Sequence, residues 1–135
     1  MIEQNRFKFF YLLGSEAGKT FKDADAEIRE AVDFILYYST KAKQLNNPHI
    51  LEGPTGEKNF LEYSSKGIFL CISPWNFPLA ILVGQVAAAL LTGNTVVCKP
   101  AEDTSLIAAE IIKLLHQAGV PESALHLLVD KKRCK

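Results

Sequence analysis

The sequence has no excess of charge of either sign, no paired set of cysteines and no cluster of histidines. Its 15 lysines and arginines balance 15 acidic residues, so no net charge favours nucleic acid or an anionic membrane. Cys71, Cys98 and Cys134 lie far apart and form no CxxC motif, which argues against a disulfide framework and a zinc site. The three histidines share no ligand spacing. We therefore expect no metal site, no nucleic-acid partner and a reducing, cytoplasmic location.

The sequence also lacks a hydrophobic run long enough to cross a membrane. No charged residue lies between Lys66 and Lys99, but Pro74 and Pro78 interrupt that stretch. Its longest piece without proline or asparagine, residues 79–93, is shorter than the roughly 20 apolar residues that a spanning helix needs. The N-terminus shows no apolar run typical of a signal peptide. We expect neither a membrane span nor secretion.

The composition is that of one globular domain, because 48% of the residues are hydrophobic and 22% are charged. Residues 1–45 predict an N-terminal helical segment, in which apolar side chains recur at spacings of three and four from Asp23 to Ala42. Thr20 is the expected start signal of this helix. Its polar face, expected to meet solvent, consists of Glu27, Arg29, Glu30 and Asp33.

Prolines and glycines punctuate the next part of the chain. The segment Asn46-Asn47-Pro48 predicts the end of the helix. Residues 46–66 predict a connecting arm with one short strand around Phe60 to Tyr63. This arm divides the chain in two.

Residues 67–130 alternate between strand and helix patterns. The apolar run 68–72 predicts a strand buried on both faces, and residues 95–98 and 125–129 predict two more. Helices are expected over 79–91 and 104–118, the first with Pro78 in its first turn. The β-α-β-α-β order indicates the fold class: α/β, with a partial doubly wound, Rossmann-like parallel sheet preceded by the helical segment. Residues 131–135 complete the chain as a basic tail.

Two motifs have structural interpretations. Residues 14–20 (GSEAGKT) are one residue short of a phosphate-binding P-loop and follow no predicted strand, so they predict a turn into the helix. Cys71 and Cys98 fall inside predicted buried strands, where a free thiol usually fills the core as a small hydrophobe. Neither motif is expected to perform chemistry.

The most informative residues follow the first two strands of the predicted sheet, at the edge where ligands bind in such folds. Residues 73–78 (SPWNFP) follow the first strand, and the amide of Asn76 either donates a hydrogen bond into the crevice or caps the next helix. Lys99 and Glu102 follow the second strand, where an ammonium and a carboxylate suit the hydroxyls and phosphate of a nucleotide. No Gly-x-Gly-x-x-Gly fingerprint is present.

These residues resemble the NAD-binding domain of the aldehyde dehydrogenase superfamily. The resemblance rests on SPWNFP at 73–78, QVAAAL at 85–90, GNTVVCKPAE at 93–102 and AGVPE at 118–122. Upstream, residues 16–19, 27–34, Tyr37-Tyr38 and 53–57 are similar to one branch, the glutamate-semialdehyde (pyrroline-5-carboxylate) dehydrogenase module of the bifunctional bacterial proline-utilisation flavoenzyme. The resemblance covers roughly residues 14–128 and accounts for the P-loop-like string.

The resemblance implies roles for particular residues. Asn76 would donate its side-chain amide to the oxyanion that forms when a cysteine thiolate attacks an aldehyde. The implied cofactor is NAD. The residues matching its cleft are Ile72, Ser73, Pro74 and Trp75, and those matching the adenosine ribose site are Lys99 and Glu102.

The chain departs from the family's pattern after Val129. The family's nucleophilic cysteine, general-base glutamate and second cofactor loop lie beyond the 135 residues, and nothing around Cys134 matches the nucleophile's motif. We therefore expect a truncated NAD-dependent aldehyde dehydrogenase of proline catabolism, inactive alone. One alternative is half of a split enzyme, in which a complementing fragment completes the site for an aldehyde substrate. The other is a noncatalytic module that binds a dehydrogenase partner or self-associates.

Overall fold

The N-terminal part of the chain is two helices joined by a tight turn. The computed structural model describes residues 1–129, so the predicted basic tail and Cys134 lie outside the described residues. A 3-10 turn, η1 (Glu3–Asn5), leads into α1 (Arg6–Ala17), and α2 spans Phe21–Leu45. Both helices lie in the predicted helical segment 1–45, but the apolar periodicity extends only from Asp23 to Ala42. α1 shows no clean apolar stripe, because its apolar residues include the exposed Phe7 and Tyr11.

The P-loop-like string, residues 14–20, forms the end of α1 and the turn into α2. Gly14 lies inside α1, and Gly18 caps that helix with a positive φ of 65°, a conformation that favours glycine. Thr20 caps α2, because its Oγ1 accepts the N–H of Asp23 at 3.2 Å. The predicted turn and start signal are confirmed, and α2 ends at Leu45, directly before the predicted stop at Asn46.

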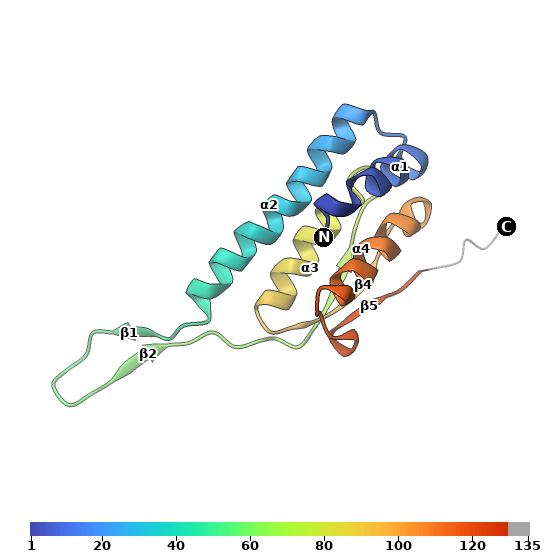
Figure 1. Ribbon diagram of the computed structural model, residues 1–135. Helices are drawn as coiled ribbons and strands as arrows, with labels where there is room; N and C mark the ends of the chain where they lie inside the picture. The colour runs from blue at the N-terminus through green and yellow to red at the C-terminus, as the bar shows by residue number, and fades with distance from the viewer. Residues whose placement is uncertain (130–135) are drawn as a thin grey trace.

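The connecting arm extends away from the rest of the molecule as a hairpin (Figure 1). Its strands, β1 (His49–Leu51) and β2 (Asn59–Leu61), pair antiparallel. The expected strand around Phe60 is present, but it ends at Leu61 and has a partner that the sequence did not predict. Ile50 is 81% exposed, so the hairpin has no core of its own.

The second half has the predicted β-α-β-α-β order. The strands β3 (Ile68–Ile72), β4 (Thr95–Lys99) and β5 (Leu125–Leu127) form a parallel sheet in the order β3-β4-β5. Helix α3 (Ala80–Leu91) joins the first two strands, and η2 (Glu102–Thr104), α4 (Ser105–Gln117) and η3 (Glu122–Ala124) lie between the last two. The α/β fold class is confirmed, although β5 is shorter than the predicted 125–129.

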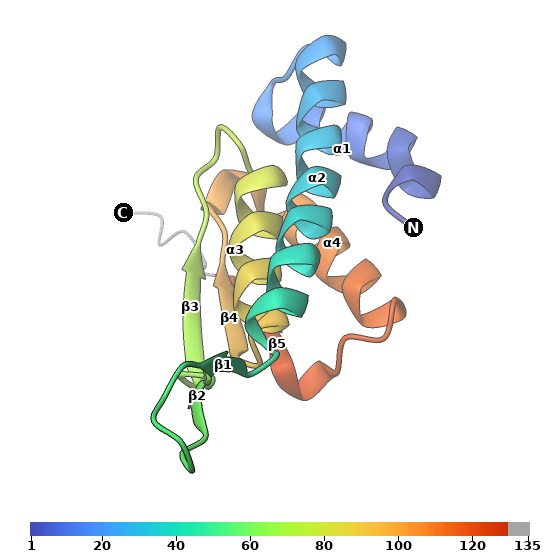
Figure 2. The ribbon, with the colours of Figure 1, turned by 90° about the vertical axis from the view of Figure 1, so that its left-hand side faces the viewer.

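All the long helices lie on one side of the sheet. Figure 2 shows β3 and β4 edge-on, with α3 beside them and α2 beyond α3. The side chains of Val96 and Cys98 point to the helices and are fully buried, whereas Ile68, Leu70 and Ile72 of β3 remain mostly exposed. The prediction that β3 is buried on both faces is therefore wrong for the described residues, because nothing in them covers the outer face.

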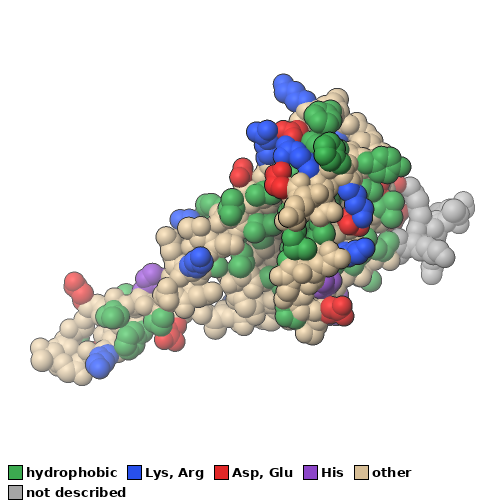
Figure 3. All heavy atoms as spheres, viewed as in Figure 1, with side chains coloured by type: hydrophobic (Ala, Val, Ile, Leu, Met, Phe, Trp, Pro, Cys, Tyr) green, Lys and Arg blue, Asp and Glu red, His purple; other side chains and the backbone are tan. Residues whose placement is uncertain are grey.

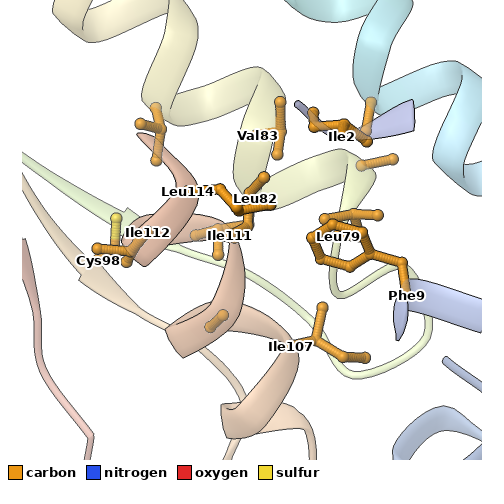
Figure 4. Packing of buried hydrophobic residues seen from close by; sticks show 14 of the residues in the cluster. Ile2, Phe9, Leu79, Leu82, Val83, Cys98, Ile107, Ile111, Ile112 and Leu114 are labelled. Atoms are coloured by element: carbon orange, nitrogen blue, oxygen red, sulfur yellow. The ribbon is translucent and has the colours of Figure 1, made fainter. Parts of the chain in front are cut away.

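The core forms where α1, α2, α3 and α4 meet. Figure 4 shows Phe9 of α1, Leu82 of α3 and Ile107 of α4 pointing toward one another around Leu79. All four side chains are fully buried. The face of the molecule seen in Figure 3 mixes basic and acidic side chains and shows no patch of one sign. Within residues 1–129, no helix combines the length and apolarity that a membrane span requires.

Candidate active site

The SPWNFP segment forms the turn between β3 and α3, at the carboxyl edge of the sheet. Ser73 is buried, and its N–H donates to the carbonyl of Lys99 at 3.2 Å, which extends the pairing of β3 with β4. After Pro74 the chain rises to the surface, where Trp75 is 60% exposed. Pro78 is buried two residues before α3, so it precedes the first helical turn instead of opening it.

Asn76 lies exposed on this turn, and no described residue holds its side-chain amide. It lines a recess of about 460 Å³ together with Trp75, Phe77, Lys19 and Glu30. The expectation that Asn76 caps α3 is wrong, because the cap position is Leu79 and its first amides bind a different residue. Asn76 is therefore available to donate a hydrogen bond into the recess.

The residue that caps α3 is Glu27, from the second turn of α2. Its Oε1 accepts the N–H of Leu79 at 2.8 Å and that of Ala80 at 3.2 Å. Its Oε2 lies 2.6 Å from Nζ of Lys19. The prediction that Glu27 faces solvent is wrong: it is 1% exposed, because helix N-termini leave amides unsatisfied and favour a negative charge.

A second glutamate caps α4 in the same way. The Oε1 of Glu16 accepts the N–H of Leu106 at 3.0 Å, and its Oε2 accepts the N–H of Ile107 at 2.8 Å. Helix N-termini are the usual phosphate sites of such sheets, but here both of these termini hold protein carboxylates. A cofactor pyrophosphate therefore has no free N-terminus at α3 or α4.

The register of the sheet brings the two predicted clusters together. Ile72 pairs with Lys99, so residues 72–75 and Lys99 end side by side at one edge. Lys99 is half-buried there, and Glu102 is exposed at the start of η2, three residues further on. The predicted crevice residues thus share one edge of the sheet, which is the arrangement expected of a ligand site.

The sequence analysis missed Glu16, Lys19 and Glu27 as parts of this region. A signal for Glu27 exists, because it lies three residues after Ala24 and four before Ala31, and both alanines are buried. That spacing places Glu27 on the apolar stripe of α2. An acidic residue on such a stripe indicates a buried partner.

Among residues 1–129, no cysteine or histidine lines the recess at Asn76. Cys71 and Cys98 pair in register on neighbouring strands and are buried. Burial raises the pKa of Cys71, and burial together with the nearby Cys71 raises the pKa of Cys98 to about 12. The core-filling interpretation is therefore confirmed for both thiols. Among residues 1–129, no three His, Cys, Asp or Glu side chains are grouped to hold a metal ion.

Comparisons with known proteins identify the family. The model of the aldehyde dehydrogenase family matches residues 1–134. Bifunctional protein PutA of Rhizobium meliloti is 49% identical over 117 residues, which are 87% of this chain and 8% of that protein. 1-Pyrroline-5-carboxylate dehydrogenase 1 of Halalkalibacterium halodurans is 41% identical over 126 residues, which are 93% of this chain and 24% of that protein.

Solved structures agree with these sequence relatives. A structure of proline utilization A (PutA) with proline bound in remote sites matches with a TM-score of 0.94 and 50% identity, over 98% of this chain and 14% of that chain. A variant of the Thermus thermophilus 1-pyrroline-5-carboxylate dehydrogenase matches with a TM-score of 0.89 and 35% identity, over 95% of this chain and 25% of that chain. The chain thus spans a quarter or less of these proteins, and it belongs to the aldehyde dehydrogenase family.

Proposed function

We propose that this chain supplies the oxyanion-binding turn and the ribose-binding part of the NAD site of a glutamate-semialdehyde (pyrroline-5-carboxylate) dehydrogenase of proline catabolism. The observation that supports the proposal most is the position of Asn76. Asn76 is exposed and lines a recess between its own turn and the start of α2, while the backbone that follows it is fixed by Glu27. The names of the relatives PutA and 1-pyrroline-5-carboxylate dehydrogenase support the substrate.

The chemistry assigned to Asn76 is stabilisation of developing negative charge. In aldehyde oxidation through a thiohemiacetal, attack of a thiolate on the carbonyl carbon converts the carbonyl oxygen to an oxyanion. A donor held in place at that oxygen pays no reorganisation cost during the reaction, and its loss typically lowers the rate by roughly 10²–10³. The free Nδ2 of Asn76 is suited to this role.

The residues at the sheet edge fit the ribose of NAD better than its pyrophosphate. Glu102 is an exposed carboxylate, the group that commonly accepts hydrogen bonds from a ribose diol. Lys99, three residues earlier, provides an ammonium group. Residues 72–75 would form the wall of the cleft. Because Glu27 and Glu16 occupy the N-termini of α3 and α4, the pyrophosphate would need donors other than these two helix starts. NAD, when bound, would accept the hydride from the substrate.

We infer that the 135-residue chain does not oxidise aldehydes alone. The two cysteines that the structure describes are buried, and the raised pKa of each keeps it a thiol at neutral pH. A thiolate is the reactive nucleophile, so neither residue is suited to attack a carbonyl. Activity then requires residues that lie beyond this chain.

The alternative of a split enzyme has a specific observation in its favour. The outer face of β3 exposes Ile68, Leu70 and Ile72. Parallel sheets normally have both faces covered. A second polypeptide carrying the rest of an aldehyde dehydrogenase domain would cover that face. A noncatalytic module that binds a dehydrogenase partner would use the same surface.

The test is complementation. The chain is co-expressed with a polypeptide that carries the remaining part of the dehydrogenase domain of a relative, and NADH formation from glutamate semialdehyde is followed by absorbance. We expect activity from the mixture and none from either part. In the active mixture, Asn76→Ala should lower kcat by roughly 10²–10³, whereas the exposed Asn47→Ala should not. NADH formation by the chain alone, or an unchanged kcat for Asn76→Ala, contradicts the proposal.

A further inference from the structure

Two oppositely charged side chains, one from the turn between α1 and α2 and one from α2, are buried beside the Asn76 turn. The side chain of Lys19 is 10% exposed and that of Glu27 is fully buried, and Nζ lies 2.6 Å from Oε2. Neither residue belongs to the SPWNFP segment or to the sheet. Removing two charges from water costs free energy, so the pair requires compensating contacts.

Both members of the pair make those contacts to the turn itself. Glu27 accepts the N–H groups of Leu79 and Ala80, directly after Pro78. Nζ of Lys19 lies 3.8 Å from the centre of the Phe77 ring, within the range of a cation–π contact. The turn is therefore held on both sides of Pro78, and the residue before Phe77 is Asn76.

A helix start can be satisfied more simply. A serine, threonine or aspartate at the cap position binds the same amides locally and buries no ion pair. The arrangement seen here does something that a local cap does not, because Glu27 and Lys19 also fix the turn relative to α2. The recess that Asn76 lines is bounded by α2 residues, including Glu30.

We propose that Lys19 and Glu27 are positioning residues that hold the Asn76 amide at the recess through Phe77 and the first amides of α3. This inference rests on the proposed function, because it assumes that Asn76 is the oxyanion donor. Both contacts depend on charge. The ammonium of Lys19 binds the turn through the Phe77 ring, and the carboxylate of Glu27 binds it through two backbone N–H groups. The pair thus acts on Asn76 without touching substrate.

The first test uses the 135-residue chain labelled with ¹⁵N. In Glu27→Gln, which keeps an acceptor but loses the charge, the amides of Leu79 and Ala80 should exchange with solvent roughly tenfold faster. In Lys19→Met, the backbone and side-chain amide signals of Asn76 should shift or broaden. Glu16→Gln is the matched control, since it removes the same kind of cap from α4 and should leave the Asn76 signals unchanged. Unchanged Asn76 signals in both Lys19→Met and Glu27→Gln overturn the inference.

The second test uses the complemented enzyme and separates this inference from the proposed function. Lys19→Met and Glu27→Gln should each lower kcat by tenfold or more, with KM for NAD unchanged. In an Asn76→Ala background they should cause no further loss, because they act through that residue. If Asn76→Ala lowers kcat but the pair's variants do not, or if the losses multiply, the positioning role is refuted while the proposed function stands. If Asn76→Ala itself has no effect, the proposed function fails with it.

Discussion

Asn94 ties the start of β3 to the turn between α3 and β4, and we expect its replacement to loosen that edge of the sheet. It is 7% exposed. Its Oδ1 accepts the N–H of Lys66 at 2.6 Å and that of Gly67 at 3.0 Å. Its Nδ2 donates to the carbonyl of Ala89 at 3.1 Å and to Oγ1 of Thr92 at 2.9 Å. One side chain thus connects the end of α3 to the entry of β3.

The magnitude follows from the two amides that Asn94→Ala leaves without an acceptor. At roughly 1 kcal/mol for each net hydrogen bond, local opening at these amides becomes easier by about 2 kcal/mol. That corresponds to roughly 30-fold faster hydrogen exchange at Lys66 and Gly67. Asn94→Asp keeps the acceptors and should leave these two rates within a few-fold of the wild type.

Hydrogen exchange measured residue by residue is the assay, and Asn47→Ala is its control. The amide of Asn47 is exposed and donates to the carbonyl of Lys43 at 2.8 Å, so it is an asparagine of similar chemistry without a role at the sheet edge. The reasoning is refuted if Gly67 exchanges at the wild-type rate in Asn94→Ala. It is equally refuted if Asn47→Ala accelerates Gly67 to the same extent.

Four further outcomes are expected. In a Cys134→Ser background at pH 8, Cys98 should react with a thiol reagent far more slowly than in the urea-unfolded chain, because a pKa near 12 leaves roughly 10³-fold less thiolate than a pKa near 9. The same raised pKa means that stability from the buried thiol is present below pH 9 and is lost as the pH rises toward 12, which alkaline unfolding by circular dichroism will show. Leu82→Ala should destabilise the fold by roughly 2–5 kcal/mol in urea titrations, since its side chain is fully buried between helices, and a loss below 1 kcal/mol would contradict the packing. The bare face of β3 should make the chain oligomeric in size-exclusion chromatography, and Leu70→Lys should shift it toward monomer; a wild-type monomer with a cooperative melt would argue against this.

Local signals in the sequence predicted the elements well where the stabilising partners are close along the chain. The cap of α2 is an example, because Thr20 binds an amide three residues away. The β-α-β-α-β order is another example, since each of these strands and helices is indicated by an apolar pattern within its own residues. The candidate site was also predictable in outline: parallel strands end at one edge, so the residues after β3 and β4 had to meet there.

The features that the sequence did not predict depend on partners that are distant along the chain. Glu27 is polar, so we expected its side chain to face solvent. It is buried instead, where it accepts hydrogen bonds from amides 52 and 53 residues later in the chain. The apolar run of β3 is compatible with burial, yet it contains no information about what covers its outer face. α1 has no clean apolar stripe, and it is fixed by packing such as that of Phe9 against the core.

The capping of α4 by Glu16 also sets an order of events during synthesis. Its partner amides follow it by 90 and 91 residues, so on a ribosome adding 5–20 residues per second the carboxylate waits roughly 5–18 s for them. Until then α1 can form, but it has no α4 to pack against. Contacts of such long sequence separation close late and slow the folding of a domain. α1 therefore gains its packing partner α4 only after the residues between them have been made.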